Sequence, residues 1–418
     1  PILPKPLIPI LIMIMFNYSK KYMHLSKLIH EKDFKLNIYF LKIIFLLTFF
    51  IVSYNFSYWV SEKSFFEYSD WLINYQGGFI RRGFTGEILY NLHLLTGIVL
   101  NYVLLTFIIT IYSIFLFTLY KLITSIKLNF INTLIIFSPL SFIYLALTKT
   151  LAGRKEILFF LLITIFFYKL KNIKFKEVKY WIIFITVTTS LTHLGFIFYI
   201  PYLILFFIYL YPSKSLKELF FQIFPILTTM FIILISLLYF PVYSELNINA
   251  VCETIKDFTK DCPKETYLDV FKLSIKDFIG VNETVSRFLP NFTENNYFIK
   301  YPVYYVLTFA PVYIALLNFK ENRKYKVKKL IYFLGIGSLF TLPVFILGAD
   351  YGRYLHWQYM CYLLIYIYIS KSGILKQSVK NILFKNKINY IFLYLIIFFY
   401  SFFWTVPHCC GKNYSFLY

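Results

Sequence analysis

The chain has 418 residues, of which 59% are hydrophobic, 22% aromatic and only 15% charged, and its formal net charge is +22. The apolar residues run in blocks of about twenty, the length at which a helix crosses a ~30 Å hydrocarbon layer. Such blocks exclude the soluble enzyme classes. They also change the meaning of the positive charge, because Lys and Arg in a membrane protein mark its cytoplasmic loops, so nucleic acid is not an expected partner. We predict an all-α polytopic membrane protein.

The first segment, residues 1–37, precedes any block long enough to span. It starts at Pro1 and holds an apolar run over residues 7–16 that is too short to cross a bilayer. No charged region with a small-residue cleavage pattern accompanies it, so a signal peptide is not expected. We interpret it as a cytoplasmic or untranslated segment. The true start is left open between three methionines: Met13, Met15 and Met23.

A membrane domain follows over residues 38–406, with about eleven predicted spans. Loops assigned to the inner side hold 25 Lys and Arg against five acids, whereas those assigned to the outer side hold 14 against 15. This asymmetry places the N-terminus inside and the tail 407–418 outside. The predicted spans are 38–60, 98–120, 131–147, 151–170, 178–192, 195–211, 219–240, 299–319, 330–349, 354–370 and 389–406.

The first outer loop, residues 61–97, carries four candidate site residues: Asp70, Arg81, Arg82 and Glu87. From Gly83 onward an apolar stripe at helical spacing predicts a short helix in the plane of the membrane interface. The two arginines either bind a ligand or anchor this helix to lipid headgroups.

The fourth predicted span begins beside Arg154, Lys155 and Glu156. Charges next to hydrocarbon are costly unless they are paired or face a polar cavity, so this group either pairs with neighbours or belongs to a site. His193 lies in SLTHLGF, where we predict a bend between two short spans. A lone His is either a hydrogen-bonded structural residue or a ligand or base.

A larger outer loop is predicted over residues 241–298. Cys252 and Cys262 within it face an oxidising side and are close enough in sequence to form a disulfide, and the sequence leaves open whether they do. Arg287 brings a further cation back towards the membrane in SRFLPNF.

The tenth predicted span opens with ADYGRYLHWQY. Asp350 and Arg353 lie three apart, and Arg353 and Trp357 four apart, so one helical face presents a carboxylate, a guanidinium and an indole. The pattern fits an ion pair with an interfacial Trp. With His356 added, it also fits a site in which Asp350, His356 and Trp357 bind an acceptor sugar. No metal-ligand spacing of Cys and His occurs, and neither a metal nor a cofactor is expected.

Five separate loops or helix ends thus deliver cations to the predicted outer face. Guanidinium forks suit a phosphate or diphosphate, which Arg holds bidentately, and a nearby carboxylate suits a general base. The chain has no Walker or Rossmann glycine pattern, and no nucleotide pool exists on that side. A lipid-linked diphosphate donor would supply an anion for these arginines and would not depend on a nucleotide. The candidate diphosphate ligands are Arg81, Arg82, Arg154, Lys155, Arg287 and Arg353.

Four motifs resemble a known family. They are DWLINYQGGFIRRGFTGEIL, GRKEILFFLL, THLGF and DYGRYLHW, and they are similar to bacterial O-antigen or capsule polymerases of the Wzy type. The resemblance implies a GT-C-like membrane glycosyltransferase of the bacterial inner membrane. It would join oligosaccharide repeat units carried on undecaprenyl diphosphate, with a flippase and a chain-length regulator of the same pathway as partners.

The resemblance also implies residue roles. Arginines on the outer face bind the diphosphate, for which the matching residues are Arg81, Arg82, Arg154 and Arg353, and an acidic residue or His activates the acceptor hydroxyl. The base is left open between Asp70, Glu87 and His193, because His193 is followed by Leu194 where many members have Glu.

Two other functions remain as alternatives. A flippase or transporter of lipid-linked sugar would need charges deep inside several spans and an inverted repeat, neither of which the sequence contains. A membrane acyltransferase that modifies the glycan would use His193 or His356 as its base.

Overall fold

The computed structural model describes residues 38–63, 68–148, 151–213, 215–239, 245–258, 293, 296–321, 325–348, 350–377 and 390–407. Within these ranges the chain is helical apart from its connections and one pair of two-residue strands, so the all-α prediction is confirmed. The predicted segment 1–37, most of the 241–298 loop and the tail after Pro407 lie outside the described residues.

Five helical segments of the described chain are long and apolar enough to cross a membrane. Their lengths agree with the roughly twenty residues that a bilayer requires. They are α2 (Ile38–Glu62), α4 (Leu100–Ile123), α10 (Leu216–Tyr239), α15 (Tyr297–Leu317) and the pair α16 (Val327–Phe340) and α17 (Leu342–Leu347).

The remaining helices of the bundle are shorter or less apolar. The predicted bend at His193 is confirmed, because one helix ends at Thr192 and the next turn begins at Leu194. The shorter or less apolar helices are α7 (Glu156–Lys169), α8 (Phe175–Thr192), the 3-10 helix η4 (Leu194–Tyr199), α9 (Ile200–Leu210), α18 (Tyr351–Ser372) and α19 (Tyr390–Phe402).

The third predicted span, 131–147, is not one helix. α5 (Phe130–Ile136) ends before Ser138 and Pro139, and only the single turn α6 (Tyr144–Leu147) follows. A proline lacks the backbone N–H that a helix interior needs and restricts the residue before it, which explains the interruption. The prediction of a continuous helix here is wrong.

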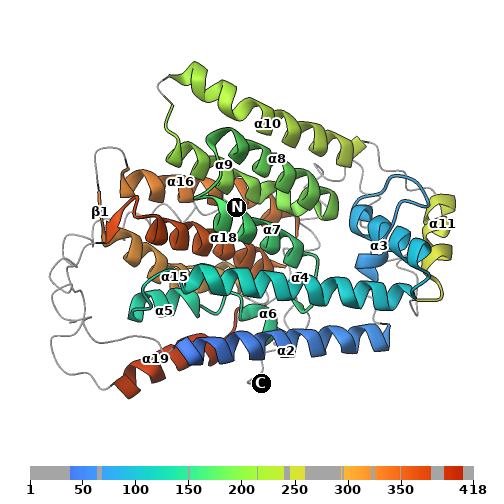
Figure 1. The fold of residues 1–418 in the computed structure, drawn as a ribbon, viewed down its shortest axis with the longest axis horizontal. Coiled ribbons are helices and arrows are strands. Elements are labelled where there is room, and N and C mark those ends of the chain that lie inside the picture. Colours follow the sequence, from blue (N-terminus) through green and yellow to red (C-terminus); the bar gives the residue numbers. More distant parts are fainter. Residues whose placement is uncertain are drawn as a thin grey trace.

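Helix α18 lies at the centre of the bundle (Figure 1), and every residue from Tyr351 to Ile369 is buried. A helix surrounded on all sides needs partners for its polar atoms. The Tyr359 hydroxyl donates to the Ile135 carbonyl oxygen at 2.8 Å, and the Tyr366 hydroxyl donates to the Asn132 side-chain oxygen at 2.5 Å. These bonds let a tyrosine-rich helix occupy the interior.

The two ends of the bundle gather different loops. At one end β1 (Phe319–Lys320) pairs antiparallel with β2 (Lys376–Gln377), which joins two loops predicted on the inner side. At the other end in Figure 1 lie α3 (Gly83–Thr96) and α11 (Glu245–Ile255), with the 3-10 helix η2 (Ser69–Leu72) packed against α3. The predicted helix from Gly83 is confirmed. Its apolar residues Ile88, Leu92 and Leu95 are exposed, as an interfacial helix requires.

Candidate functional site

Two loops far apart in sequence interlock to build the candidate site. The Trp71 indole N–H donates to the carbonyl oxygen of Gly153, and Lys155 Nζ donates to the carbonyl oxygen of Arg82 at 2.9 Å. Gly153 has φ +82°, and a Cβ there would lie 1.9 Å from the Phe56 ring. Glycine at this position therefore allows the loop before α7 to reach η2 and α3.

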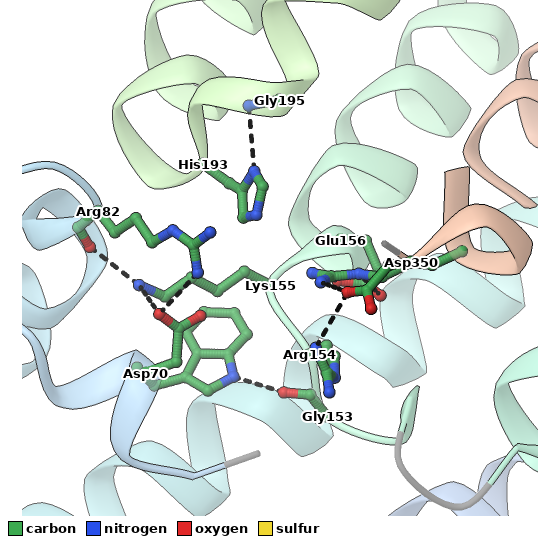
Figure 2. Close-up of polar contacts among 11 residues, drawn as sticks. Asp70, Arg82, Gly153, Arg154, Lys155, Glu156, His193, Gly195 and Asp350 are labelled. Atoms are coloured by element: carbon green, nitrogen blue, oxygen red, sulfur yellow. Dashed lines mark hydrogen bonds and ion pairs between the residues drawn. The ribbon is translucent and has the colours of Figure 1, made fainter. Parts of the chain in front are cut away.

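Asp70 lies between two cations from these loops (Figure 2). Its Oδ1 is 3.4 Å from Arg82 Nη1 and 3.6 Å from Lys155 Nζ. Burial raises the pKa of the Asp70 carboxyl, but the charges of Lys155 and Arg82, with Arg353 and Arg154 behind them, outweigh burial and leave the pKa below its usual value. Asp70 is therefore ionised at neutral pH.

A second group of ion pairs adjoins the first. Arg353 donates to both carboxylate oxygens of Glu156, from Nε at 2.9 Å and from Nη2 at 2.8 Å. Its Nη1 donates to Asp350 Oδ2 at 3.2 Å, and Arg154 Nη1 lies 4.0 Å from the same oxygen. The guanidinium also sits 5.0 Å from the centre of the Trp357 ring. Arg353 thus links α7 to the start of α18 through a bidentate pair.

Burial divides these residues into two layers, which we call the exposed layer and the buried layer. Side chains of the exposed layer are 12% to 23% accessible, whereas those of the buried layer are at most 6% accessible. Of these seven charged residues, only those of the exposed layer are accessible from solvent, and Lys155 and Arg353 of the buried layer pair with Asp70 and Asp350. The exposed layer is Asp70, Arg82, Arg154 and Asp350; the buried layer is Lys155, Glu156 and Arg353.

The two layers together hold four cations and three carboxylates, so the cluster carries one net positive charge. His193 faces them from the junction between α8 and η4 (Figure 2). An excess cation in a partly buried cluster attracts an anion, and guanidinium groups at its edge fit phosphate oxygens.

Arg81 and Glu87 make their contacts elsewhere. Arg81 is buried, and its Nε donates to the carbonyl oxygen of Leu237 in α10 at 2.7 Å. Glu87 accepts from the backbone N–H of Tyr75 at 2.8 Å and from the Gln76 amide at 2.9 Å. Arg81 thus attaches the first outer loop to α10, and Glu87 forms hydrogen bonds within that loop. Their predicted roles as diphosphate ligand and base are not supported by these contacts.

His356 and Trp357 were predicted to bind an acceptor sugar, and in the structure both side chains are fully buried. His356 Nδ1 is 2.8 Å from the carbonyl oxygen of Leu140, and the Tyr144 and Phe160 rings pack on it. Of the three predicted acceptor residues only Asp350 reaches the exposed layer.

Two further predictions fall outside the described residues, namely Arg287 as a diphosphate ligand and Cys262 as half of a disulfide. Cys252 itself is disulfide-bonded. In the described part of the chain, no three His, Cys, Asp or Glu side chains lie together as a metal site would require.

The pairing of Glu156 with Arg353 is the main feature that sequence reasoning missed. The available signal was that both residues open helices predicted to start on the same face. Spacing within a segment revealed the pair of Asp350 and Arg353, which are three residues apart, but it carries no information about a partner 197 residues away.

Comparison with known proteins returns no match: no protein-family model, curated protein or solved structure resembles this chain closely enough to be recognised. The likeness to polysaccharide polymerases therefore remains a prediction.

Proposed function

We propose that this chain is an integral membrane glycosyltransferase that joins oligosaccharide repeat units carried on undecaprenyl diphosphate, at the outer face of a bacterial cytoplasmic membrane. The observation that carries the proposal is the exposed layer: Arg82 and Arg154 come from separate loops, Arg82 beside an ionised Asp70 and Arg154 beside Asp350, in a cluster of net positive charge. About eleven spans in a GT-C-like arrangement are the architecture that we propose with it.

The diphosphate fits Arg82 and Arg154 best. Both arginine side chains are partly accessible, at 20% and 15%, and each guanidinium offers a fork of N–H donors. Lys155 and Arg353 were predicted as direct ligands too, but their burial favours a supporting role. Lys155 forms an ion pair with Asp70 and donates a hydrogen bond to the Arg82 carbonyl oxygen, and Arg353 forms an ion pair with Asp350.

The reaction transfers a glycan from a diphosphate to a hydroxyl. The acceptor oxygen forms a bond to the anomeric carbon, the bond from that carbon to the diphosphate oxygen breaks, and undecaprenyl diphosphate leaves with the electron pair. Arg82 and Arg154 stabilise the charge that builds up on the leaving group. Asp70 accepts the hydroxyl proton. Because its pKa is lowered, this transfer becomes favourable only as the hydroxyl acidifies in the transition state.

The alternative functions gain less support. An acyltransferase with His356 as base requires an accessible imidazole, and that ring is fully buried. A flippase would place its charges along a route through the bundle, whereas this cluster joins the loops that precede α3, α7 and α18.

Arg82→Ala and Arg154→Ala test the proposal in cells that depend on this chain for surface polymer. We expect long polymer to disappear while single repeat units still reach the outside. A matched control is Lys320→Ala, which removes an exposed cation from the strand pair at the other end. Normal polymer in both arginine variants would contradict the proposal, and lipid-linked units held inside the cell would favour a flippase.

A further inference from the structure

His193 lies inside an apolar stretch of sequence, yet the structure places its ring next to the charged cluster. It ends α8 and begins η4, and its ring points from this junction towards Arg82 and Lys155 (Figure 2). The Phe196 and Trp357 rings pack on the imidazole, with ring centroids 5.2 Å and 5.4 Å away. These contacts fix the orientation of the ring, so the roles of its two nitrogens are also fixed.

The hydrogen bond to Nδ1 determines the tautomer. The backbone N–H of Gly195 donates to His193 Nδ1 at 3.1 Å. A backbone N–H can only donate, so Nδ1 must be the unprotonated nitrogen. A neutral imidazole carries one N–H, which is therefore on Nε2. The opposite tautomer would set two donors against each other.

Protonation of both nitrogens is opposed by the surroundings. Burial lowers the pKa of His193 well below its usual value, and the charges of Arg82, Arg353, Lys155 and Arg154 lower it further. A second proton would also break the bond to Gly195. His193 is thus neutral at physiological pH, with a donor at Nε2 and no free lone pair.

Within the described chain, the bond to Gly195 is the one hydrogen bond that the His193 ring makes. The ring points towards the cations Arg82 and Lys155 in Figure 2, so a hydrogen-bond donor here suits an oxygen atom of an anionic ligand.

We propose that His193 binds the diphosphate by donating the Nε2 hydrogen to a phosphoryl oxygen, and that it does not accept the acceptor's proton. The inference rests on the proposed function and deepens it, because it adds a neutral third contact to Arg82 and Arg154. It also removes His193 from the candidate bases, which leaves Asp70.

Side-chain replacements separate a donor from a base. His193→Gln keeps an amide N–H in reach of the same oxygen, His193→Ala keeps nothing, and His193→Glu presents an acceptor. The probes are farnesyl diphosphate and inorganic pyrophosphate, with farnesol as the lipid without charge, titrated by calorimetry into the purified full chain in detergent.

We expect His193→Ala to weaken binding of both diphosphates about tenfold to a hundredfold, the usual loss for a hydrogen bond to a charged group. His193→Gln should restore binding to within a few fold and keep the pH profile of polymerisation, whereas His193→Glu should bind no better than His193→Ala. Binding of pyrophosphate alone would identify the phosphates, and not the lipid, as the recognised part. Farnesol binding that depends on His193 would overturn the proposal.

A measurement on the unaltered chain avoids any folding defect in the variants. Nitrogen spectra of protein with isotope-labelled histidine report the tautomer directly, and the His193 signal should be that of the Nε2–H form and should shift when pyrophosphate is added. An Nδ1–H signal would overturn the proposal, as would a His193→Gln variant that folds but binds like His193→Ala. If the wild type binds no diphosphate, the proposed function fails first; if it binds and only these histidine results disagree, this inference alone fails.

Discussion

Arg82 combines a partly accessible charge with a strained backbone. It has φ +68° and ψ +4°, in the left-handed region that costs a residue with a Cβ about 1 to 2 kcal/mol. Strain held at a charged, accessible residue is typical of functional sites, where other contacts impose it. Here Lys155 bonds to the Arg82 carbonyl oxygen and Asp70 pairs with the side chain.

Substitution of Arg82 should therefore separate stability from activity. We expect Arg82→Gly to unfold at the same temperature as the wild type or higher, because glycine relieves the strain, while polymerisation is lost with the charge. Arg82→Ala loses the charge and keeps the strain, so it should be less stable than Arg82→Gly by about 1 kcal/mol. Thermal unfolding in detergent measures both, and equal stability of the two variants would contradict the strain.

Asp70 predicts a pH dependence. Its folded pKa lies below the usual value of 3.8, so its ionised form stabilises the fold. That stabilisation is complete above the unfolded pKa, near 4, and is lost as the pH falls through the lower folded value. The difference in stability between the wild type and Asp70→Asn should be constant from neutral pH to about pH 5 and shrink at more acidic pH. A stability difference that grows on acidification would contradict a lowered pKa for Asp70.

At the scale of elements, the pair of Glu156 and Arg353 fixes α7 to the start of α18. Glu156 is fully buried and the Arg353 side chain is 6% accessible, so loss of one partner leaves an uncompensated buried charge. We expect Glu156→Leu or Arg353→Met alone to destabilise the chain by about 3 to 5 kcal/mol. The double variant Glu156→Leu with Arg353→Met should recover much of that loss. A double variant as unstable as the sum of the two single variants would show that the residues are not coupled.

The loop before α7 depends on Gly153. A Cβ at Gly153 would lie 1.9 Å from the Phe56 ring, and φ is +82°, so Gly153→Ala should lower the unfolding temperature and reduce diphosphate binding. Gly335 in α16 is the matched control, since a Cβ there meets nothing within 4 Å. Gly335→Ala should be neutral or stabilise the helix by up to about 1 kcal/mol. Similar effects of the two alanines would contradict this account.

The positions of most helices could be predicted from the sequence, because hydrocarbon length and charged flanks leave little freedom. The exceptions have physical causes. The third span fails at Ser138 and Pro139, where a local proline effect outweighs hydrophobicity. The central place of α18 depends on partners such as Asn132 and Ile135, which a tyrosine-rich sequence does not identify.

For the whole molecule, the charge asymmetry predicted which loops share a side, and the structure groups those loops accordingly. Residues 319–320 and 376–377 pair at one end, while Arg82, Lys155 and Asp350 meet in one cluster. The sequence could not show how deeply each of these charged side chains is buried. Arg82 and Lys155 looked equivalent as cations, yet packing leaves one accessible and the other fully buried.

Sidedness predicts a labelling pattern. Asn91 in α3 and Lys320 in β1 are both exposed. With a membrane-impermeant thiol reagent on intact cells, we expect Asn91→Cys to label and Lys320→Cys to label only after the membrane is opened. Labelling of the unsubstituted chain, whose Cys361 is buried, sets the background. Equal labelling of both positions in intact cells would contradict the topology.

In the proposed function, the exposed layer binds a lipid-linked diphosphate and transfers its glycan. Its most direct test is purified chain in liposomes supplied with repeat units on undecaprenyl diphosphate, with product length read on a gel. We expect a ladder of polymer and released undecaprenyl diphosphate from the wild type, and neither from Arg154→Ala, while Lys320→Ala matches the wild type. Single units that stay unjoined with the wild type, or an unchanged ladder from Arg154→Ala, would contradict it.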